Sequence, residues 1–510
     1  MNSIYTHFDE TAMVKKTAFL LSFLLTGFGY IFAQEVVKAN IPPDFDAFVQ
    51  RVHREWKIPG MVVAVVKDGQ IVFVKGYGQT ALDASAKAVD GDTQFVIAST
   101  SKAFTAALLA TVIDEGKLKW TDTLIKHLPE FQLYDPWVTQ NFQVRDIMVH
   151  KTGFRAYAAD DLPFFGYNRD ELIRLYRHIQ PSYSFRTTYA YNNSLYTLSA
   201  QLIEKYTGKS WDEAMIERIF KPLEMKNSTT GNLSYFSSTA LAGGYRVSKS
   251  GDSLRVTPRS DREDAFTWLS AIAPAGFVMS TGNDMAHWLQ MLLGKGKYQG
   301  REVISERNFR YLISPQTITG SDSVSLFNYA QGWTIEQGPK GRYIRHTGLA
   351  YGYTALVGLV PELDMGFAIL TNNGTTSDPQ AAIGRQLIDM YLGETGKDWQ
   401  KHYFDNYMKP AAPRSPEAKR DSIPPLAARA YTGEYFLSEF GTARVYLKDG
   451  ALQFALKKVD SPLTHKSGNV FSFYVPGVGR LDLSFVVEGG QARELTFNIG
   501  DPLRPFRRIE

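Results

Sequence analysis

Residues 97–113 read IASTSKAFTAALLATVI, and this stretch decides what kind of fold the chain adopts. Apolar side chains recur with helical spacing from Phe104 to Ile113, and Gly116 ends the run. Ser99 stands at the start of the pattern, and Lys102 lies three residues further on, one helical turn along the same face. The sequence therefore predicts a helix in which a lysine amine reaches a serine hydroxyl.

The Ser99–Lys102 pair combines a candidate nucleophile with a candidate base. A serine alcohol reacts poorly until a neighbouring base takes its proton. Lys102 serves as that base only in its neutral form, which burial or a nearby cation would favour. The start of a helix also directs backbone N–H groups towards negative charge that develops on a substrate. Because such a pair arises easily by chance in a chain of 510 residues, an ordinary helix cap stays open as an alternative for this motif alone.

Two later segments carry groups that suit the same chemistry. Tyr191-Asn192-Asn193 places a phenol and an amide on a loop before the helical pattern that begins at Leu195. His346-Thr347-Gly348 ends a predicted strand and leads into Leu349. A glycine there lets a substrate lie against the strand edge. We expect the Leu349 N–H to pair with that of Ser99 as an oxyanion hole.

Ser-x-x-Lys, Tyr-x-Asn and His-Thr-Gly, in this order, resemble the motifs of the serine β-lactamase and penicillin-binding protein superfamily. The resemblance extends from about Phe45 to Leu392. It points to the class C β-lactamase-like branch, which includes esterases, D-aminopeptidases and related serine peptidases. It implies an α+β fold, in which an antiparallel sheet is flanked by helices and carries a helical subdomain. Supporting segments are Ile58-Pro59-Gly60, Gly76-Tyr77-Gly78, His150-Lys151-Thr152-Gly153, Pro274-Ala275-Gly276 and Gly332-Trp333.

The resemblance also implies roles for individual residues. Ser99 would be the acyl-forming nucleophile, and Lys102 and Tyr191 the general base pair, with Tyr191 returning a proton to the leaving group. Water would then hydrolyse the ester bond to Ser99. No cofactor and no metal are implied. The implied substrate-binding residues are Asn193, His346, Thr347, Gly348 and Leu349.

His346 departs from the pattern, because strong β-lactamases and most penicillin-binding proteins carry lysine there. Lysine pairs permanently with a β-lactam carboxylate, whereas histidine is charged only part of the time at neutral pH. We therefore expect hydrolysis of esters or small peptides, D-amino-acid peptides included. β-Lactamase or D-Ala-D-Ala carboxypeptidase activity is the first alternative, and a non-catalytic penicillin-binding-like sensor or binding module is the second.

The N-terminus has the layout of a secretory signal. Lys15 and Lys16 precede an apolar run over 17–32, and Ala33 follows at the expected cleavage point. The prediction is a signal peptide over 1–33, with Met13 as an alternative start, and a secreted or periplasmic protein without a stable membrane span after cleavage. An uncleaved anchor is the alternative.

The predicted hydrolase domain spans 40–400. Within it, Met61–Val66 and Ile71–Val74 flank Asp68-Gly69 and predict a hairpin of two buried strands. Gly208-Lys209-Ser210 looks like the end of a phosphate-binding loop but lacks the required earlier glycine, so it predicts a helix stop. Further strands are predicted at 332–336, 343–346, 354–360 and 366–370.

A proline-rich linker over 401–426 leads to a small all-β domain over 427–510, a lipocalin-like barrel or a sandwich. It resembles the β domain appended to many members of this branch. Such domains can cover the active site or support homo-oligomers, and a passive appendage is the alternative.

The composition of the chain argues against several classes of function. The chain has no cysteine, which excludes disulfides, thiolate nucleophiles and Cys-type metal sites. A net charge of +4 without blocks of like charge gives no electrostatic case for nucleic acid. The expected partner is a small ester or peptide substrate.

Overall fold

The computed structural model of the protein describes residues 40–234, 240–260, 262–410, 425–497 and 504–509. The predicted signal peptide over 1–33 lies outside the described residues, and so does the 411–424 part of the predicted linker.

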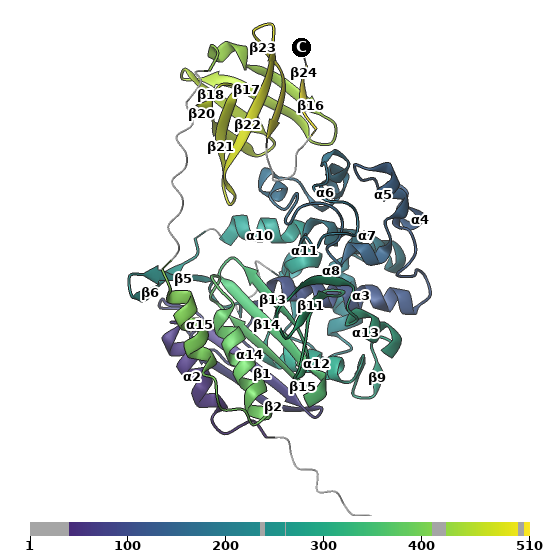
Figure 1. The fold of residues 1–510 in the computed structure, drawn as a ribbon, viewed down its shortest axis with the longest axis vertical. Coiled ribbons are helices and arrows are strands. Elements are labelled where there is room, and N and C mark those ends of the chain that lie inside the picture. The colour runs from purple at the N-terminus through teal and green to yellow at the C-terminus, as the bar shows by residue number, and fades with distance from the viewer. Residues whose placement is uncertain (1–39, 235–239, 261, 411–424, 498–503, 510) are drawn as a thin grey trace, which may run out of the picture. The chain divides into compact units, whose positions relative to one another are not determined.

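An eight-stranded antiparallel sheet forms the centre of the hydrolase domain (Figure 1). Strand β1 pairs with β15, so the first strands of the domain join the last ones across about 300 residues of sequence. This agrees with the predicted antiparallel sheet. In spatial order the strands are β10 (Thr317–Ser321), β11 (Leu326–Tyr329), β12 (Thr334–Gly338), β13 (Gly341–Ala350), β14 (Tyr353–Val360), β15 (Met365–Thr371), β1 (Gly60–Lys67) and β2 (Gln70–Gly78).

The hairpin β1–β2 forms as predicted, but its two strands differ in burial. Alternate β1 side chains enter the two cores on either face of the sheet, Val63 and Val65 on one side and Val62 and Ala64 on the other. Strand β2 lies at the sheet edge, and most of its side chains are exposed or half-buried. The expectation that both strands are buried is therefore wrong for β2, because an edge strand has a neighbour on one side only.

Helices cover both faces of the sheet (Figure 1). One face packs against α2 (Phe45–Glu55), α14 (Asp378–Tyr391) and α15 (Trp399–Met408), and the other against α12 (Gly282–Leu293). The Trp56 indole donates a hydrogen bond to Gln400 Oε1 at 2.7 Å and packs edge-on against Phe404. The predicted linker therefore starts too early, because its residues 401–408 are helical and packed on the hydrolase domain.

The quoted stretch forms α3 (Ser101–Asp114), and all of its residues from Ser101 to Ile113 are buried. A helix that is apolar all round belongs in the middle of a core. The 3₁₀ turn η1 (Ala98–Thr100) precedes it, so Ser99 lies just before the helix and not in its first turn.

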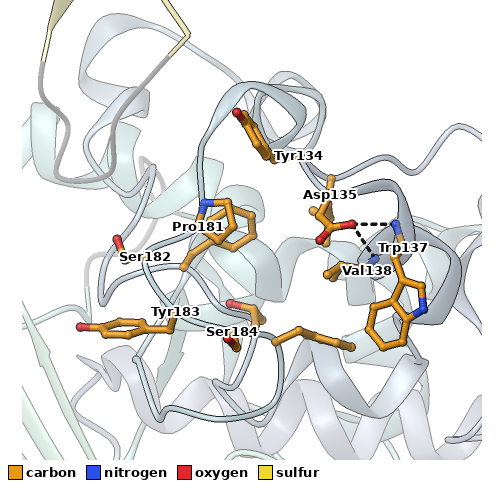
Figure 2. A pocket seen from close by; sticks show the side chains of 12 residues that line it. Tyr134, Asp135, Trp137, Val138, Pro181, Ser182, Tyr183 and Ser184 are labelled. Atoms are coloured by element: carbon orange, nitrogen blue, oxygen red, sulfur yellow. Dashed lines mark hydrogen bonds between the residues drawn. The ribbon is translucent and has the colours of Figure 1, made fainter.

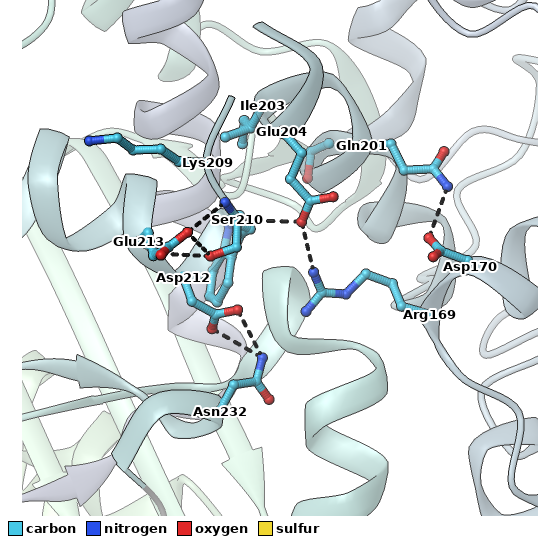
Figure 3. A network of polar contacts seen from close by, with 12 residues as sticks. Arg169, Asp170, Gln201, Ile203, Glu204, Lys209, Ser210, Asp212, Glu213 and Asn232 are labelled. Atoms are coloured by element: carbon cyan, nitrogen blue, oxygen red, sulfur yellow. Dashed lines mark hydrogen bonds and ion pairs between the residues drawn. The ribbon is translucent and has the colours of Figure 1, made fainter. Parts of the chain in front are cut away.

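The helical subdomain surrounds α3 and is held by polar contacts between its helices (Figure 3). Arg169 of α6 and the Trp211 N–H of α8 both donate to Glu204 of α7. Gly208 ends α7 in the left-handed conformation, and Ser210 caps α8, which confirms the predicted helix stop. The remaining helices of the domain are α4 (Leu124–His127), α5 (Pro136–Asn141), α6 (Arg169–Leu175), α7 (Leu198–Thr207), α8 (Trp211–Met215), α9 (Gly231–Ser234), α10 (Arg262–Ala271), α11 (Ala273–Gly276) and α13 (Glu306–Leu312). Short strands are β3 (Phe95–Val96), β4 (Thr229–Thr230), β5 (Tyr245–Ser250), β6 (Ser253–Pro258), β7 (Val278–Ser280), β8 (Lys297–Tyr298) and β9 (Arg301–Glu302).

The C-terminal domain is a nearly closed barrel of antiparallel strands, which agrees with the predicted all-β unit. Its core is aromatic, with Phe454, Phe473 and Phe497 in mutual ring contact. In spatial order the strands are β19 (Val459–Pro462), β18 (Ala451–Leu456), β17 (Gly441–Lys448), β16 (Gly433–Leu437), β24 (Phe506–Ile509), β23 (Gln491–Phe497), β22 (Gly479–Glu488), β21 (Val470–Val475) and β20 (Thr464–Ser467).

Candidate active site

Ser99 opens onto a cavity of about 670 Å³. Its walls come from the helical subdomain, from β11, β12, β13 and the β13–β14 turn, and from the β21–β22 turn of the barrel, which contributes Gly477. Its lining residues are Ser99, Tyr157, Asp160, Asp161, Phe164, Tyr189, Tyr191, Asn193, Trp268, Tyr329, Thr334, His346, Thr347, Leu349, Tyr351 and Gly477.

A tight contact between η1 and β13 fixes the position of Ser99. Ala98 has a φ of 48°, a conformation that non-glycine residues adopt rarely. A Cβ on Gly348 would lie 2.2 Å from the Ile97 carbonyl oxygen. Only glycine at 348 therefore lets β13 lie directly on the turn that carries Ser99. This packing requirement is separate from the close approach of a substrate, which we expected from the sequence.

Lys102 is fully buried beside the nucleophile. Its Nζ lies 3.3 Å from Ser99 Oγ, 2.6 Å from Asn193 Oδ1 and 2.8 Å from the Ala275 carbonyl oxygen. Burial lowers the pKa of Lys102 to about 7, against an opposing pull from the Asp160 carboxylate. The amine therefore exists partly in its neutral form near neutral pH, as a base must.

The Tyr191 loop is anchored by backbone contacts. The Tyr191 carbonyl accepts from the Tyr157 N–H at 2.7 Å, and the Asn192 N–H donates to His150 Nδ1 at 3.1 Å. Tyr191 lines the cavity together with Ser99, and Lys102 Nζ lies 4.7 Å from the centre of the Tyr191 ring. Burial raises the pKa of Tyr191 well above its ordinary value, so the side chain is a neutral phenol that can give up a proton only to a strong acceptor.

Asn193 is oriented by a carboxylate that the sequence did not single out. Asp160 is buried and accepts from Asn193 Nδ2 at 2.6 Å, from the Ser194 N–H at 3.0 Å and from Ser194 Oγ at 2.8 Å. With its Nδ2 on Asp160, Asn193 must present Oδ1 to Lys102. Asp160 precedes the aromatic segment at 162–165, and no motif marks it in the sequence.

His346 lies in β13 and is buried against Tyr329. Its Nδ1 donates to the Thr347 carbonyl at 2.6 Å, and Tyr329 Oη donates to its Nε2 at 2.9 Å. Burial, with a contribution from nearby Lys102, lowers the pKa of His346 to about 3. The expectation of part-time charge is therefore corrected: this histidine is neutral at pH 7.

The predicted substrate-binding strand edge lines the cavity. Strand β12 begins opposite Arg345, so in the described strands the 346–350 part of β13 pairs only with β14. The Thr347 and Leu349 side chains are exposed there. The oxyanion hole formed by the Ser99 and Leu349 amides stays a prediction.

A second cavity, of about 550 Å³, lies between α5 and the loop around Tyr183 (Figure 2). Its lining includes Ser182 and Ser184 but no lysine or histidine that could activate them. Over the described ranges, three or more acidic or histidine side chains do not gather as a metal site would need. Nor does any helix in those ranges have the length and apolar character to cross a membrane.

Comparison with known proteins bears on both domains. The β-lactamase family profile matches residues 45–389, and the profile of a domain of unknown function, DUF3471, matches residues 417–507. The octameric penicillin-binding protein homologue from Pyrococcus abyssi superposes with a TM-score of 0.59 at 19% identity, over 92% of this chain and 99% of that one. At that identity the likeness shows the fold alone.

Relatives of similar sequence include hydrolases. Unguisins hydrolase ungD' of Aspergillus campestris is 30% identical, over 77% of this chain and 75% of its own. Protein flp of Staphylococcus aureus is 24% identical, over 71% of this chain and 70% of its own. With a family profile matching well over half of its length, the chain belongs to the β-lactamase family.

Proposed function

We propose that the protein is a serine hydrolase that cleaves esters or small peptides through an acyl-enzyme on Ser99. One observation carries the proposal: Lys102 Nζ lies 3.3 Å from Ser99 Oγ, at the wall of an open cavity. The lowered pKa of Lys102, to about 7, leaves part of the amine neutral near pH 7 and so able to accept the proton. The hydrolase name of the Aspergillus relative supports the same class of reaction.

The proposed reaction has two steps. Neutral Lys102 takes the proton of Ser99 while Oγ attacks the substrate carbonyl, and the Ser99 and Leu349 amides stabilise the resulting oxyanion. Tyr191 gives its proton to the leaving alcohol or amine and recovers one from the Lys102 ammonium. Water then attacks the acyl carbon by the same route, which releases the acid and restores Ser99.

Substrates that place no carboxylate near His346 fit this site best. A neutral His346 offers no positive charge to a β-lactam or to a C-terminal carboxylate. β-Lactamase or D-Ala-D-Ala carboxypeptidase activity is therefore the weaker reading. A binding module that does not turn over is weaker still, because Lys102 contacts both Ser99 and Tyr191.

Labelling with a fluorophosphonate probe tests the nucleophile. We expect wild type to label and Ser99→Ala to lose the label, while Ser184→Ala, in the second cavity, keeps it. Failure of wild type to label would overturn the proposal. Parallel assays with a p-nitrophenyl short-chain ester, a D-alanyl anilide and a chromogenic cephalosporin then rank the substrates, and rapid cephalosporin turnover would reverse the predicted order.

We also propose that the protein is exported, on the basis of the signal-like pattern over 15–33. Cell fractionation with N-terminal sequencing of the mature protein tests this, and an intact, cytoplasmic N-terminus would refute it. The octameric state described for the Pyrococcus abyssi homologue supports a proposal of self-association. Light scattering after gel filtration tests it, and a monomer at micromolar concentration would refute it.

A further inference from the structure

The charges that line the Ser99 cavity are all of one sign. Asp160 and Asp161 are the acidic side chains in the lining, and the lining contains no lysine or arginine. His346 adds no positive charge, and Lys102 is buried behind Ser99. The surface that a substrate meets is therefore negative.

The two carboxylates differ in how they are satisfied. Asp160 is buried and accepts three hydrogen bonds from Asn193 and Ser194. Asp161 is half-buried at the start of η3 (Leu162–Phe165), and its side chain does not cap that turn. Within the described ranges, the Asp161 carboxylate has neither a hydrogen-bond donor nor an ion-pair partner. Because it lines the cavity, this carboxylate is accessible to a cationic group on a substrate.

Asp161 is mostly ionised at pH 7, although its surroundings raise its pKa. Burial, and then the neighbouring Asp160, raise its pKa to about 6, and Arg155 acts in the opposite direction. The Arg155 guanidinium makes a contact of its own, with the Ala156 carbonyl. Asp161 therefore presents a carboxylate whose charge Arg155 offsets only in part.

Aromatic rings complete the surroundings of Asp161. Phe164 follows it on the same 3₁₀ turn and stacks on Trp268 with ring centroids 6.2 Å apart. Both rings and Tyr157 line the cavity. Aromatic faces attract cations and accommodate the apolar stem of an amine.

We propose that Asp161 makes the enzyme selective for substrates that carry a protonated amine. This inference rests on the proposed function, because it names the substrate class of the same cavity. The ammonium could be the α-amine of an amino-acid ester or short peptide, or the terminal amine of a lysine-like side chain. Both share the chemistry that Asp161 recognises, and substrates distinguish them.

Two matched ester pairs separate these sources. D-Phenylalanine methyl ester and methyl 3-phenylpropanoate differ by an α-ammonium, and Nα-acetyl-D-lysine and Nα-acetyl-D-norleucine methyl esters differ by a side-chain ammonium. At about pH 6.5 substrate amines are largely protonated. Wild type should prefer the charged member of at least one pair. Asp161→Asn should lower kcat/KM for that member about tenfold relative to the neutral member, through KM.

Two control variants test whether a change in substrate preference comes from the charge at position 161. Asp161→Glu, which keeps the charge, should retain much of the preference. Asp252→Asn, which removes a charge at the exposed β5–β6 turn, should leave it unchanged. A second readout needs no turnover: 3-phenylpropylamine should compete with fluorophosphonate labelling of wild type better than 3-phenylpropanol does, and lose that advantage in Asp161→Asn.

The outcomes separate this inference from the proposed function. Ser99-dependent labelling without an ammonium preference, or a preference that survives in Asp161→Asn, overturns the role of Asp161 and leaves the hydrolase standing. Absence of Ser99-dependent labelling and of ester hydrolysis overturns both. An equal loss on charged and neutral esters shows a structural role and also overturns the inference.

Discussion

Replacing Asp160 by asparagine should move the pH profile of the enzyme towards acid. Activity requires neutral Lys102, so kcat/KM for an uncharged ester should rise with pH through the pKa of Lys102, about 7. Asp160 holds that pKa up, because its negative charge favours the ammonium form. Removing the charge favours the free amine, and the midpoint of the rise should fall.

The size of the shift follows from the hydrogen-bonded chain. Lys102 Nζ reaches Asn193 Oδ1 at 2.6 Å, and Asn193 Nδ2 reaches Asp160 at 2.6 Å, which puts the two charges about 7 Å apart. At an effective dielectric constant of about 20, that separation is worth about 2 kcal/mol, or about 1.5 pH units. Because the cavity admits water, we expect an observed shift of about one unit.

The assay is a kcat/KM profile between about pH 5 and 9 with methyl 3-phenylpropanoate, whose lack of charge keeps the titration of Asp161 out of substrate binding. Ser194→Ala is the matched control, since it removes one hydrogen bond to Asp160 and keeps the charge. Its midpoint should stay within about 0.3 units. A midpoint in Asp160→Asn that stays fixed or rises would refute the electrostatic role of Asp160, whatever happens to kcat.

Tyr191→Phe should lower kcat by about 10²- to 10⁴-fold through loss of the proton donor, whereas Tyr189→Phe, also in the cavity wall, should retain activity. Equal effects of the two substitutions in steady-state kinetics would contradict the role of Tyr191 as proton donor. Gly348→Ala would place a Cβ 2.2 Å from a carbonyl oxygen and should cost about 1–3 kcal/mol in denaturant unfolding, whereas Gly320→Ala, which meets open space in the same sheet, should be nearly neutral. Gly477→Val would place a Cβ 2.3 Å from the Phe164 ring and should raise KM for bulky esters; an unchanged KM would show that the barrel turn does not bound the substrate site.

Local sequence pattern was enough to predict the antiparallel sheet, whereas the grouping of the three motifs was implied by the resemblance to a known family. A short run of apolar, mostly β-branched residues, such as Val62–Val66, strongly favours a buried strand. Helix ends at Gly208 and Ser210 follow from chemistry within a few residues. The linker boundary failed for the opposite reason, since the helix over 399–408 is held by contacts with Trp56, nearly 350 residues away.

The parts of the site that escaped prediction depend on contacts that are distant in sequence. Asp160 acts through Asn193, and Tyr329 fixes the protonation of His346, yet neither belongs to a motif. Gly477 enters the cavity wall from another domain. The charge state of His346 was predicted from its residue type, and only the packing around it shows how strongly burial favours the neutral ring.

Asp160 affects both the pKa of the base, Lys102, and the charge of the substrates that the cavity favours. A lysine buried as completely as Lys102 would lose its proton far below neutral pH if nothing opposed desolvation. Asp160 supplies that opposition, but a buried carboxylate so near the cavity also repels any anionic substrate group and raises the pKa of Asp161 next to it. The negative charge of Asp160, which keeps the pKa of Lys102 near 7, thus disfavours substrates with carboxylates and favours substrates with protonated amines. A lysine in place of His346 would meet this arrangement as an extra cation beside Lys102, so His346→Lys should lower the pKa of Lys102 further while it improves carboxylate binding.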